Sequence, residues 1–335
     1  MIRFAVIGAG GIADRRTIPA MVKSSECTLV AVMERVESVA KAVGEKYSVP
    51  YFLDEEEMLN AIECDAVYIA TPVFCHYEQV MKALKYGKHV FVEKPLCLSV
   101  NEGEELLAAF KKAGLQLTVG YMMKHHNLHE KAKELVAADG IGKVVDVRAQ
   151  FSCWYPDIPG AWRQNKALGG GGAFMDLGVH CVELIEDVLE EEIVEVKSLY
   201  NTQSFGYEVE DSAVMIFRTQ SGALGHIDVN FNIPDRACQS KLELYGTKGY
   251  ILCTGTLAQE EVGTLRHLYA PQEDYSAQQN DRAALEPAEY TGAGSDLYQK
   301  QLEKFCAILK SGTPDYFYAE RAVQVQKIVE KMYQN

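Results

Sequence analysis

The stretch Arg3-Phe-Ala-Val-Ile7 followed by Gly8-Ala-Gly-Gly-Ile-Ala13 decides the fold of this 335-residue chain. The apolar run predicts a buried β-strand, and the residues from Ala13 to about Lys23 predict a helix. A G-x-G-x-x-A turn between a strand and a helix lets the backbone approach a pyrophosphate, whose charge the helix N-terminus favours. We therefore expect a dinucleotide cofactor to bind at this turn, through Gly8, Gly10, Gly11 and Ile12.

Strands and helices continue to alternate as far as Gly120. Each apolar run is short, and a polar, helix-forming stretch separates it from the next. This alternation is typical of a doubly wound parallel sheet with helices on its faces. The remaining strands are predicted at Thr28–Met33, Tyr51-Phe52, Ala66–Ala70, His89–Val92 and Gln116–Gly120.

The second half of the chain has a different sequence pattern. From Val144 to Tyr269, strand-like runs follow one another with turns between them, which favours a mostly antiparallel sheet. One helix, roughly Gly172–Val188, interrupts these runs, and two helices close the chain. We expect an α/β protein in which residues 1–122 bind the cofactor and residues 123–335 form an α+β substrate-binding and oligomerisation domain with a large, open, mostly antiparallel sheet. The alternative for the two closing helices is that they pack back on the first domain. Polar Gln259–Gly294 is expected to be an irregular surface excursion.

Composition excludes several classes of partner. The formal net charge of −14 argues against nucleic acid, because phosphate recognition needs a basic surface. No apolar run approaches the ~18 residues that span a membrane, and no secretory signal is recognisable. The nine cysteines contain no C-x-x-C pair and are expected to be reduced thiols. We expect a cytoplasmic protein without a nucleic-acid or membrane partner.

The residue that follows the second strand bears on the choice of cofactor. Glu34 stands where an acidic side chain accepts hydrogen bonds from the adenosine ribose, which favours NAD. Arg35 beside it is able to hold a 2′-phosphate, so NADP stays possible. We expect both residues to contact the cofactor, with NAD preferred.

A lysine ends the fifth strand, in Val90-Phe-Val-Glu-Lys-Pro95. The carboxyl ends of parallel strands are where open α/β sheets bind their ligands, and Thr71-Pro72 ends the fourth strand on the same side. A surface lysine after a strand is the ordinary alternative. We expect Lys94, Thr71 and Pro72 to face the cofactor.

The run Gly169–Gly172 opens a second group of polar residues. Glycines permit unusual backbone angles and close approach, and the helix that follows carries Asp176 and His180 four residues apart. A carboxylate and an imidazole on one face of a helix are able to bind a diol and to transfer a proton. An ordinary helix with a buried, hydrogen-bonded histidine is the alternative for this spacing alone.

These motifs together resemble the Gfo/Idh/MocA family, which includes glucose–fructose oxidoreductase and inositol dehydrogenases. The resemblance covers essentially the whole chain and implies a Rossmann domain followed by an α+β domain. It also implies transfer of a hydride between NAD(P) and a secondary hydroxyl of a sugar, sugar derivative or cyclitol. A homodimer or homotetramer through the large sheet is implied as well. The motifs are Gly8-x-Gly10-x-x-Ala13, Ala70-Thr71-Pro72 with His76, Glu93-Lys94-Pro95, and the glycines with Asp176-x-Gly178-x-His180.

The resemblance assigns roles to individual residues. Lys94 would contact the nicotinamide region and the substrate hydroxyl, either taking its proton or stabilising the oxyanion by charge. Asp176 and His180 would bind the substrate, with His180 the usual candidate for the general base. The bond before Pro95 is a candidate for the cis form. His76 and Glu93 are assigned to the cofactor side, and Tyr121, Trp162 and Arg163 to the substrate pocket.

Other activities are compatible with the same residues. Some members of this family hold NAD tightly and cleave glycosides through transient oxidation of the sugar ring, so a hydrolase or lyase is the main alternative. Other small-molecule dehydrogenases and a non-catalytic dinucleotide-binding regulator are weaker ones. Accumulation of free NADH would separate net redox chemistry from glycoside cleavage.

One stretch departs from the family pattern, Tyr121-Met-Met-Lys-His-His-Asn127. Lys124 is positioned to replace an arginine that relatives carry near the substrate. His125, His126 and His129 could be metal ligands, substrate-pocket residues or exposed residues at a helix start. No metal site is expected, because no cysteine or carboxylate arrangement supports one.

Overall fold

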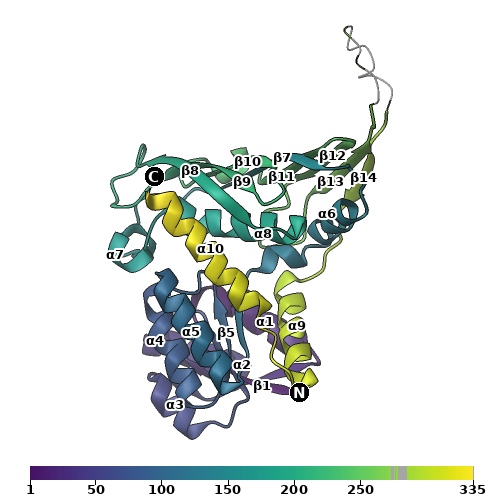
Figure 1. The fold of residues 1–335 in the computed structure, drawn as a ribbon. Coiled ribbons are helices and arrows are strands. Elements are labelled where there is room, and N and C mark those ends of the chain that lie inside the picture. The colour runs from purple at the N-terminus through teal and green to yellow at the C-terminus, as the bar shows by residue number, and fades with distance from the viewer. Residues whose placement is uncertain (273–274, 276, 278–284, 335) are drawn as a thin grey trace. The chain divides into compact units, whose positions relative to one another are not determined.

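The computed structural model describes residues 1–272, 275, 277 and 285–334 of the chain (Figure 1). It divides into two compact units. The first contains Met1–Tyr121 together with Tyr298–Lys327, and the second contains Met122–Leu297 together with the chain from Ile328 onward.

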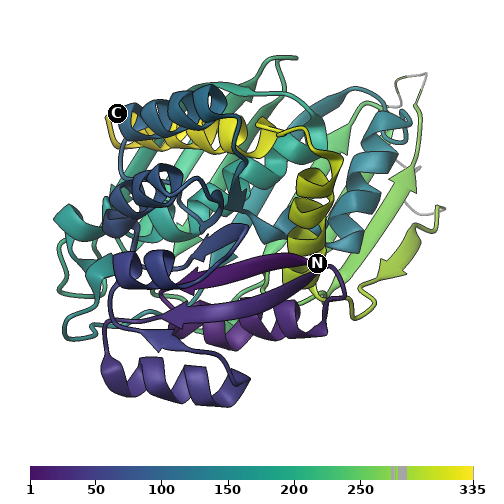
Figure 2. The same ribbon diagram turned by 90° about the horizontal axis from the view of Figure 1, so that it is seen from below.

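The first unit is built on a six-stranded sheet, sheet A, in the order β3-β2-β1-β4-β5-β6. All of its strand pairs are parallel, so the predicted doubly wound sheet is confirmed. Figure 2 shows these strands side by side, with helix α9 next to the start of β1. The strands are β1 (Ile2–Ile7), β2 (Cys27–Met33), β3 (Tyr51–Phe52), β4 (Ala66–Ile69), β5 (His89–Glu93) and β6 (Leu117–Gly120).

The helices of this unit begin where the sequence offers caps. The Asp54 carboxylate accepts from the N–H groups of Glu56 and Glu57, and Ser99 forms a capping box with Glu102. The segment after the glycine turn is a π-helix, Ala13–Thr17, which continues into α1 (Ile18–Lys23). The others are α2 (Glu37–Tyr47), α3 (Glu55–Ala61), α4 (Val73–Lys85), α5 (Val100–Ala113), α9 (Leu297–Ser311) and the first part of α10 (Phe317–Gln334).

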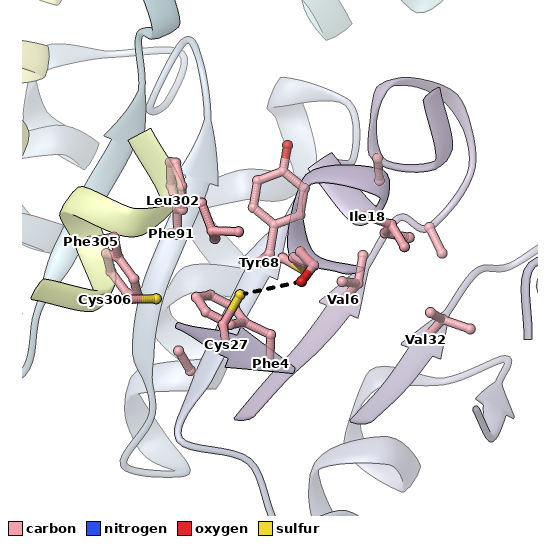
Figure 3. Close-up of a cluster of buried hydrophobic side chains, with 14 of the residues drawn as sticks. Phe4, Val6, Ile18, Cys27, Val32, Tyr68, Phe91, Leu302, Phe305 and Cys306 are labelled. Carbon is pink, nitrogen blue, oxygen red and sulfur yellow. Dashed lines mark hydrogen bonds between the residues drawn. The ribbon is translucent and has the colours of Figure 1, made fainter. Parts of the chain in front are cut away.

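Helix α9 contributes side chains to the core of this first unit. The ring of Phe305 lies 5.6 Å from that of Phe4 on β1 and 5.4 Å from that of Phe91 on β5. Leu302 and Cys306 join the same buried cluster (Figure 3). A segment from the end of the chain therefore completes the core that the first 121 residues begin.

The second unit is built on an eight-stranded sheet, sheet B, in the order β14-β13-β12-β11-β7-β10-β9-β8. Its pairs are antiparallel except β7 with β10. The strands are β7 (Val144–Ser152), β8 (Ile193–Asn201), β9 (Ser212–Thr219), β10 (Leu224–Asn230), β11 (Lys241–Gly246), β12 (Gly249–Thr254), β13 (Thr264–Tyr269) and β14 (Ala288–Thr291).

The polar stretch Gln259–Gly294, expected to be an irregular surface excursion, contains two strands among its described residues, of which the sequence predicted β13 and missed β14. Strand β14 lies within it and pairs with β13, which also begins inside it. Backbone hydrogen bonds at the sheet edge hold β14 in place, although its residues lack an apolar run. Residues 273–274, 276 and 278–284 of this stretch lie outside the described part of the chain.

The two faces of sheet B differ in exposure. Along β9, Ala213, Met215 and Phe217 are buried, whereas Val214 and Ile216 between them are exposed. Figure 1 shows helices α6 (Asn127–Ala137), α7 (Lys166–Gly169) and α8 (Val179–Leu189) on one side of the sheet. The short helical segments of this unit are η2 (Met122–His125), η3 (Trp162–Gln164), η4 (Phe174–Gly178) and η5 (Asp235–Ala237).

All nine cysteines are thiols. Within the part of the chain that the structure describes, no helix has both the length and the apolar character needed to cross a membrane.

Candidate functional site

The glycine turn after β1 borders a cavity of about 370 Å³. Gly8 and Gly11 have φ angles of +79° and +57°, which glycine adopts at little cost. A Cβ on Gly8 would lie 2.8 Å from the backbone nitrogen of Thr71, so glycine is required there. The cavity is lined by Gly8, Gly10, Gly11, Met33, Glu34, Arg35, Ala70, Thr71, Pro72, Phe74, Cys75 and Gln79.

Glu34 is held against the glycine turn. Its carboxylate accepts from the N–H of Gly10 at 3.3 Å and from that of Val36 at 3.3 Å. A Cβ on Gly10 would lie 3.4 Å from the same carboxylate, so the turn and the acidic side chain fit closely. The residues around this cavity suit the adenosine half of a dinucleotide, with Glu34 available to accept from ribose hydroxyls.

His76 does not line this cavity, although the sequence assigned it to the cofactor side. It is buried in α4, with its ring nitrogens 2.9 Å from the carbonyl oxygens of Thr71 and Pro95. The His76 ring therefore links the loop after β4, at Thr71, to the loop after β5, at Pro95. Gln79 was missed by sequence reasoning, and it accepts from the Thr71 hydroxyl at 2.5 Å.

Glu93 ends strand β5, Lys94 follows it, and the bond before Pro95 is cis. The Tyr68 hydroxyl donates to the Glu93 carboxylate at 2.5 Å and accepts from the Thr17 hydroxyl at 2.8 Å. Burial, together with the Glu93 charge, raises the pKa of Tyr68 well above its usual range, so the phenol stays a donor. The Tyr68 hydroxyl thus holds the Glu93 carboxylate in place, and the half-buried Lys94 follows Glu93 directly.

Asp176 and His180 lie on successive helical segments of the second unit. Asp176 belongs to the π-helix η4, and His180 to the first turn of α8. The ring of Phe174 covers Gly178, where a Cβ would lie 2.7 Å from the ring carbons. π-Helical turns are frequent at functional sites, and this one replaces the regular α-helix expected from the sequence.

Asp176 forms an ion pair with Arg163. The Arg163 Nε lies 3.2 Å from the Asp176 carboxylate, and the guanidinium stacks 4.2 Å from the centre of the Trp162 ring. Tyr155 also interacts with Arg163, and burial raises the pKa of its phenol, which stays protonated at neutral pH. Tyr155, Trp162, Arg163 and Asp176 therefore offer hydroxyl, aromatic and charged groups of the kind that bind sugars.

His180 and Tyr121 are both buried. The His180 ring lies 6.1 Å from that of Phe151, edge to face. Tyr121, expected in the substrate pocket, is only 2% exposed at the end of the first unit.

Two of the three unusual histidines hold loops together. His126 accepts from the N–H of Leu128, and its other nitrogen lies 2.9 Å from the Val262 carbonyl oxygen. His129 contacts the Met123 carbonyl at 2.8 Å and the Thr256 hydroxyl at 2.9 Å. Burial lowers the pKa of His129 to about 3, so it is neutral. Of the alternatives left open for these two histidines, exposure at a helix start is wrong, because both are buried.

Lys124 is buried as well. Its ammonium lies 2.5 Å from the Glu183 carboxylate on α8. Among residues 1–272, 275, 277 and 285–334, no group of three or more His, Cys, Asp or Glu side chains is placed to hold a metal ion.

The glycine turn, the acidic residue after β2 and the cavity between them are those of a dinucleotide-binding α/β protein. Residues 2–121 match the family described as "Oxidoreductase family, NAD-binding Rossmann fold", and residues 129–252 match the "GFO/IDH/MocA C-terminal domain". The chain belongs to the GFO/IDH/MocA family of NAD(P)-binding oxidoreductases.

Its relatives include sugar reductases and dehydrogenases. The chain is 28% identical to 1,5-anhydro-D-fructose reductase of Ensifer adhaerens over 79% of each sequence. It is also 28% identical to D-xylose 1-dehydrogenase (NADP(+)) 2 of Haloferax volcanii, over 99% of this chain and 96% of the relative. Aldose-aldose oxidoreductase from Caulobacter crescentus has the same fold, with a TM-score of 0.87 at 24% identity over 99% of this chain and 96% of that chain.

Proposed function

We propose that this enzyme transfers a hydride between a nicotinamide cofactor, preferably NAD, and a secondary hydroxyl of a sugar, sugar derivative or cyclitol. The observation that carries the proposal is the presence, on one chain, of a glycine-turn cavity for a dinucleotide and a group of sugar-binding type around Asp176. The relatives named above act on sugars, which supports this substrate class. They are named as a reductase and a dehydrogenase, and lend no support to the hydrolase or lyase alternative.

The bound cofactor would donate or accept the hydride, and residues of this chain would manage the proton and the hydroxyls. His180 is proposed to take the hydroxyl proton during oxidation and to return it during reduction. Lys94 would stabilise the negative charge that develops on the same oxygen. Asp176, oriented by Arg163, would accept from a neighbouring sugar hydroxyl.

A panel of sugars, inositols and glycosides tests this proposal. Each compound is incubated with NAD and, separately, NADP, and the reduced cofactor is followed by its absorbance. Net reduction with at least one free sugar or cyclitol is the expected result. Cleavage of a glycoside without net reduced cofactor would instead favour the redox-assisted hydrolase or lyase.

The charge of Glu34 is expected to select against the 2′-phosphate of NADP. In a Glu34→Ser variant, the NAD-to-NADP ratio of kcat/KM should fall by about tenfold or more, because a like-charge contact costs several kcal/mol. Steady-state kinetics with each cofactor measure this ratio. Glu37→Ser, on the exposed start of α2, is the matched control. An unchanged ratio would remove Glu34 from cofactor selection.

We propose a homodimer or homotetramer formed through the exposed face of sheet B. Ile216 and Leu224 are 56% and 54% exposed on neighbouring strands of this face, and Leu199 on β8 is 82% exposed. A pocket of about 290 Å³ is lined by residues of β7, β8, β9 and β10. Exposed apolar side chains on one sheet face, here beside the charged Glu195, Lys197 and Arg218, are typical of interaction sites. The reduced state of nine cysteines is in keeping with a cytoplasmic enzyme, which we also propose.

A charge among these exposed apolar side chains is expected to dissociate the oligomer. Ile216→Glu would bury carboxylates against the partner without compensation, which favours the single chain. Analytical ultracentrifugation should give the mass of one chain for this variant and a multiple of it for the wild type. Lys112→Glu, exposed on α5 of the first unit, should keep the wild-type mass. A wild-type mass for Ile216→Glu would place the interface elsewhere.

A further inference from the structure

The glycine run before Asp176 is tied to a buried carboxylate. Glu210, only 5% exposed, accepts from the N–H of Gly172 at 2.9 Å through one oxygen and from the N–H of Phe174 at 2.9 Å through the other. The N–H of Ala173 donates to the Glu210 carbonyl oxygen at 3.0 Å. Three consecutive backbone N–H groups at the start of the helical segment are therefore satisfied by one residue.

A tyrosine from the end of α10 completes this arrangement. The Tyr333 hydroxyl donates to the Glu210 carboxylate at 2.7 Å. Burial and the Glu210 charge raise the pKa of Tyr333 well above its usual range, so it remains a donor at neutral pH. The carboxylate thus has three hydrogen bonds, which compensate its removal from water.

The same contacts explain why glycines stand at two of the four positions. A Cβ on Gly171 would overlap the Tyr333 hydroxyl, and a Cβ on Gly172 would overlap the Glu210 carbonyl oxygen. The backbone that follows Glu210 is fixed too, because Asp211, the next residue, is fully buried. Its carboxylate accepts from the N–H groups of Gln203, Ser204 and Phe205.

We infer that Glu210 and Tyr333 are positioning residues, which fix the start of the segment that carries Asp176 and His180 and so set where these two side chains meet the substrate. This inference rests on the proposed function, because it assigns the substrate to Asp176 and His180. Phe174, whose N–H binds Glu210, is also the residue whose ring covers Gly178 between Asp176 and His180. A change in the position of the Glu210 carboxylate would therefore move Phe174 and, with it, the turn that carries Asp176 and His180.

Two nearly isosteric variants test the inference. Glu210→Gln sets an amide NH₂ against a backbone N–H, and Tyr333→Phe removes one hydroxyl only. A displacement of catalytic groups by about 1 Å is able to lower the reaction rate by about 10²-fold. We therefore expect kcat/KM for the sugar to fall by about 10–100-fold in Glu210→Gln and by less in Tyr333→Phe. The fall should include a higher KM for the sugar, whereas loss of folded protein would lower the apparent kcat alone.

The cofactor and the control variant complete the experiment. Affinity for NAD, followed by quenching of protein fluorescence, should not change, because the glycine-turn cavity belongs to the first unit. Tyr269→Phe is the matched control, since Tyr269 is 50% exposed on β13 and the variant should leave the sugar kinetics unchanged. Deuterium uptake in residues 172–180 should rise in both test variants and not in the control.

The outcomes separate this inference from the proposed function. Folded Glu210→Gln and Tyr333→Phe proteins with wild-type sugar kinetics and wild-type deuterium uptake would overturn the positioning role. A wild-type enzyme that turns over no sugar would refute the proposed function, and deuterium uptake alone would then decide whether Glu210 and Tyr333 hold the segment.

Discussion

Lys94→Ala is expected to lower kcat for the sugar by about 10²–10³-fold, the effect of removing one group that stabilises developing negative charge. Lys94 directly follows Glu93, which Tyr68 and Thr17 hold in place, so the position of the lysine backbone does not depend on its own side chain. The variant should therefore fold normally and bind NAD with wild-type affinity. Stopped-flow measurement of hydride transfer, with the sugar saturating, gives the rate to compare.

Lys94→Met and Lys85→Ala sharpen this test. Methionine keeps the length and apolar stem of lysine without its charge, so Lys94→Met should lose as much activity as Lys94→Ala. Lys85, exposed near the end of α4, is the control for loss of one positive charge and should retain full activity. Near wild-type turnover in both Lys94 variants would exclude the lysine from proton transfer and from charge stabilisation alike.

The sequence predicted the architecture well because each strand of sheet A carries its own signal. β1 and β5 are short apolar runs, and each is bounded by glycine, proline or charged residues. β14 carries no such signal, since it is polar and exists through its pairing with β13.

The candidate site was predictable only where a motif is local in sequence. Lys94, Asp176 and His180 stand in short motifs, whereas the residues that hold their surroundings come from far along the chain. Tyr68 is 25 residues from Glu93, and Tyr333 is 123 residues from Glu210. No periodicity or spacing links such partners, because only folding brings them together. His126 and His129 show the same limit, since the sequence left their environment open and only the fold shows that both are buried.

Replacement of His180 by alanine is the second prediction with a large expected effect. If His180 accepts the hydroxyl proton, kcat should fall by about 10²–10⁴-fold, the usual range for loss of a general base. The ring is only 4% exposed and packs edge to face on Phe151, so the substitution leaves a space of imidazole shape. Added imidazole is expected to enter that space and restore part of the activity.

Chemical rescue distinguishes the two proposed roles. Imidazole should rescue His180→Ala with a dependence on pH that follows the titration of free imidazole, because only its neutral form accepts a proton. Primary amines should rescue Lys94→Ala through their charged form if the lysine stabilises an oxyanion, and through their neutral form if it is the base. Rescue of Lys94→Ala by neutral amines, together with a nearly active His180→Ala, would transfer the proton-accepting role from the histidine to the lysine.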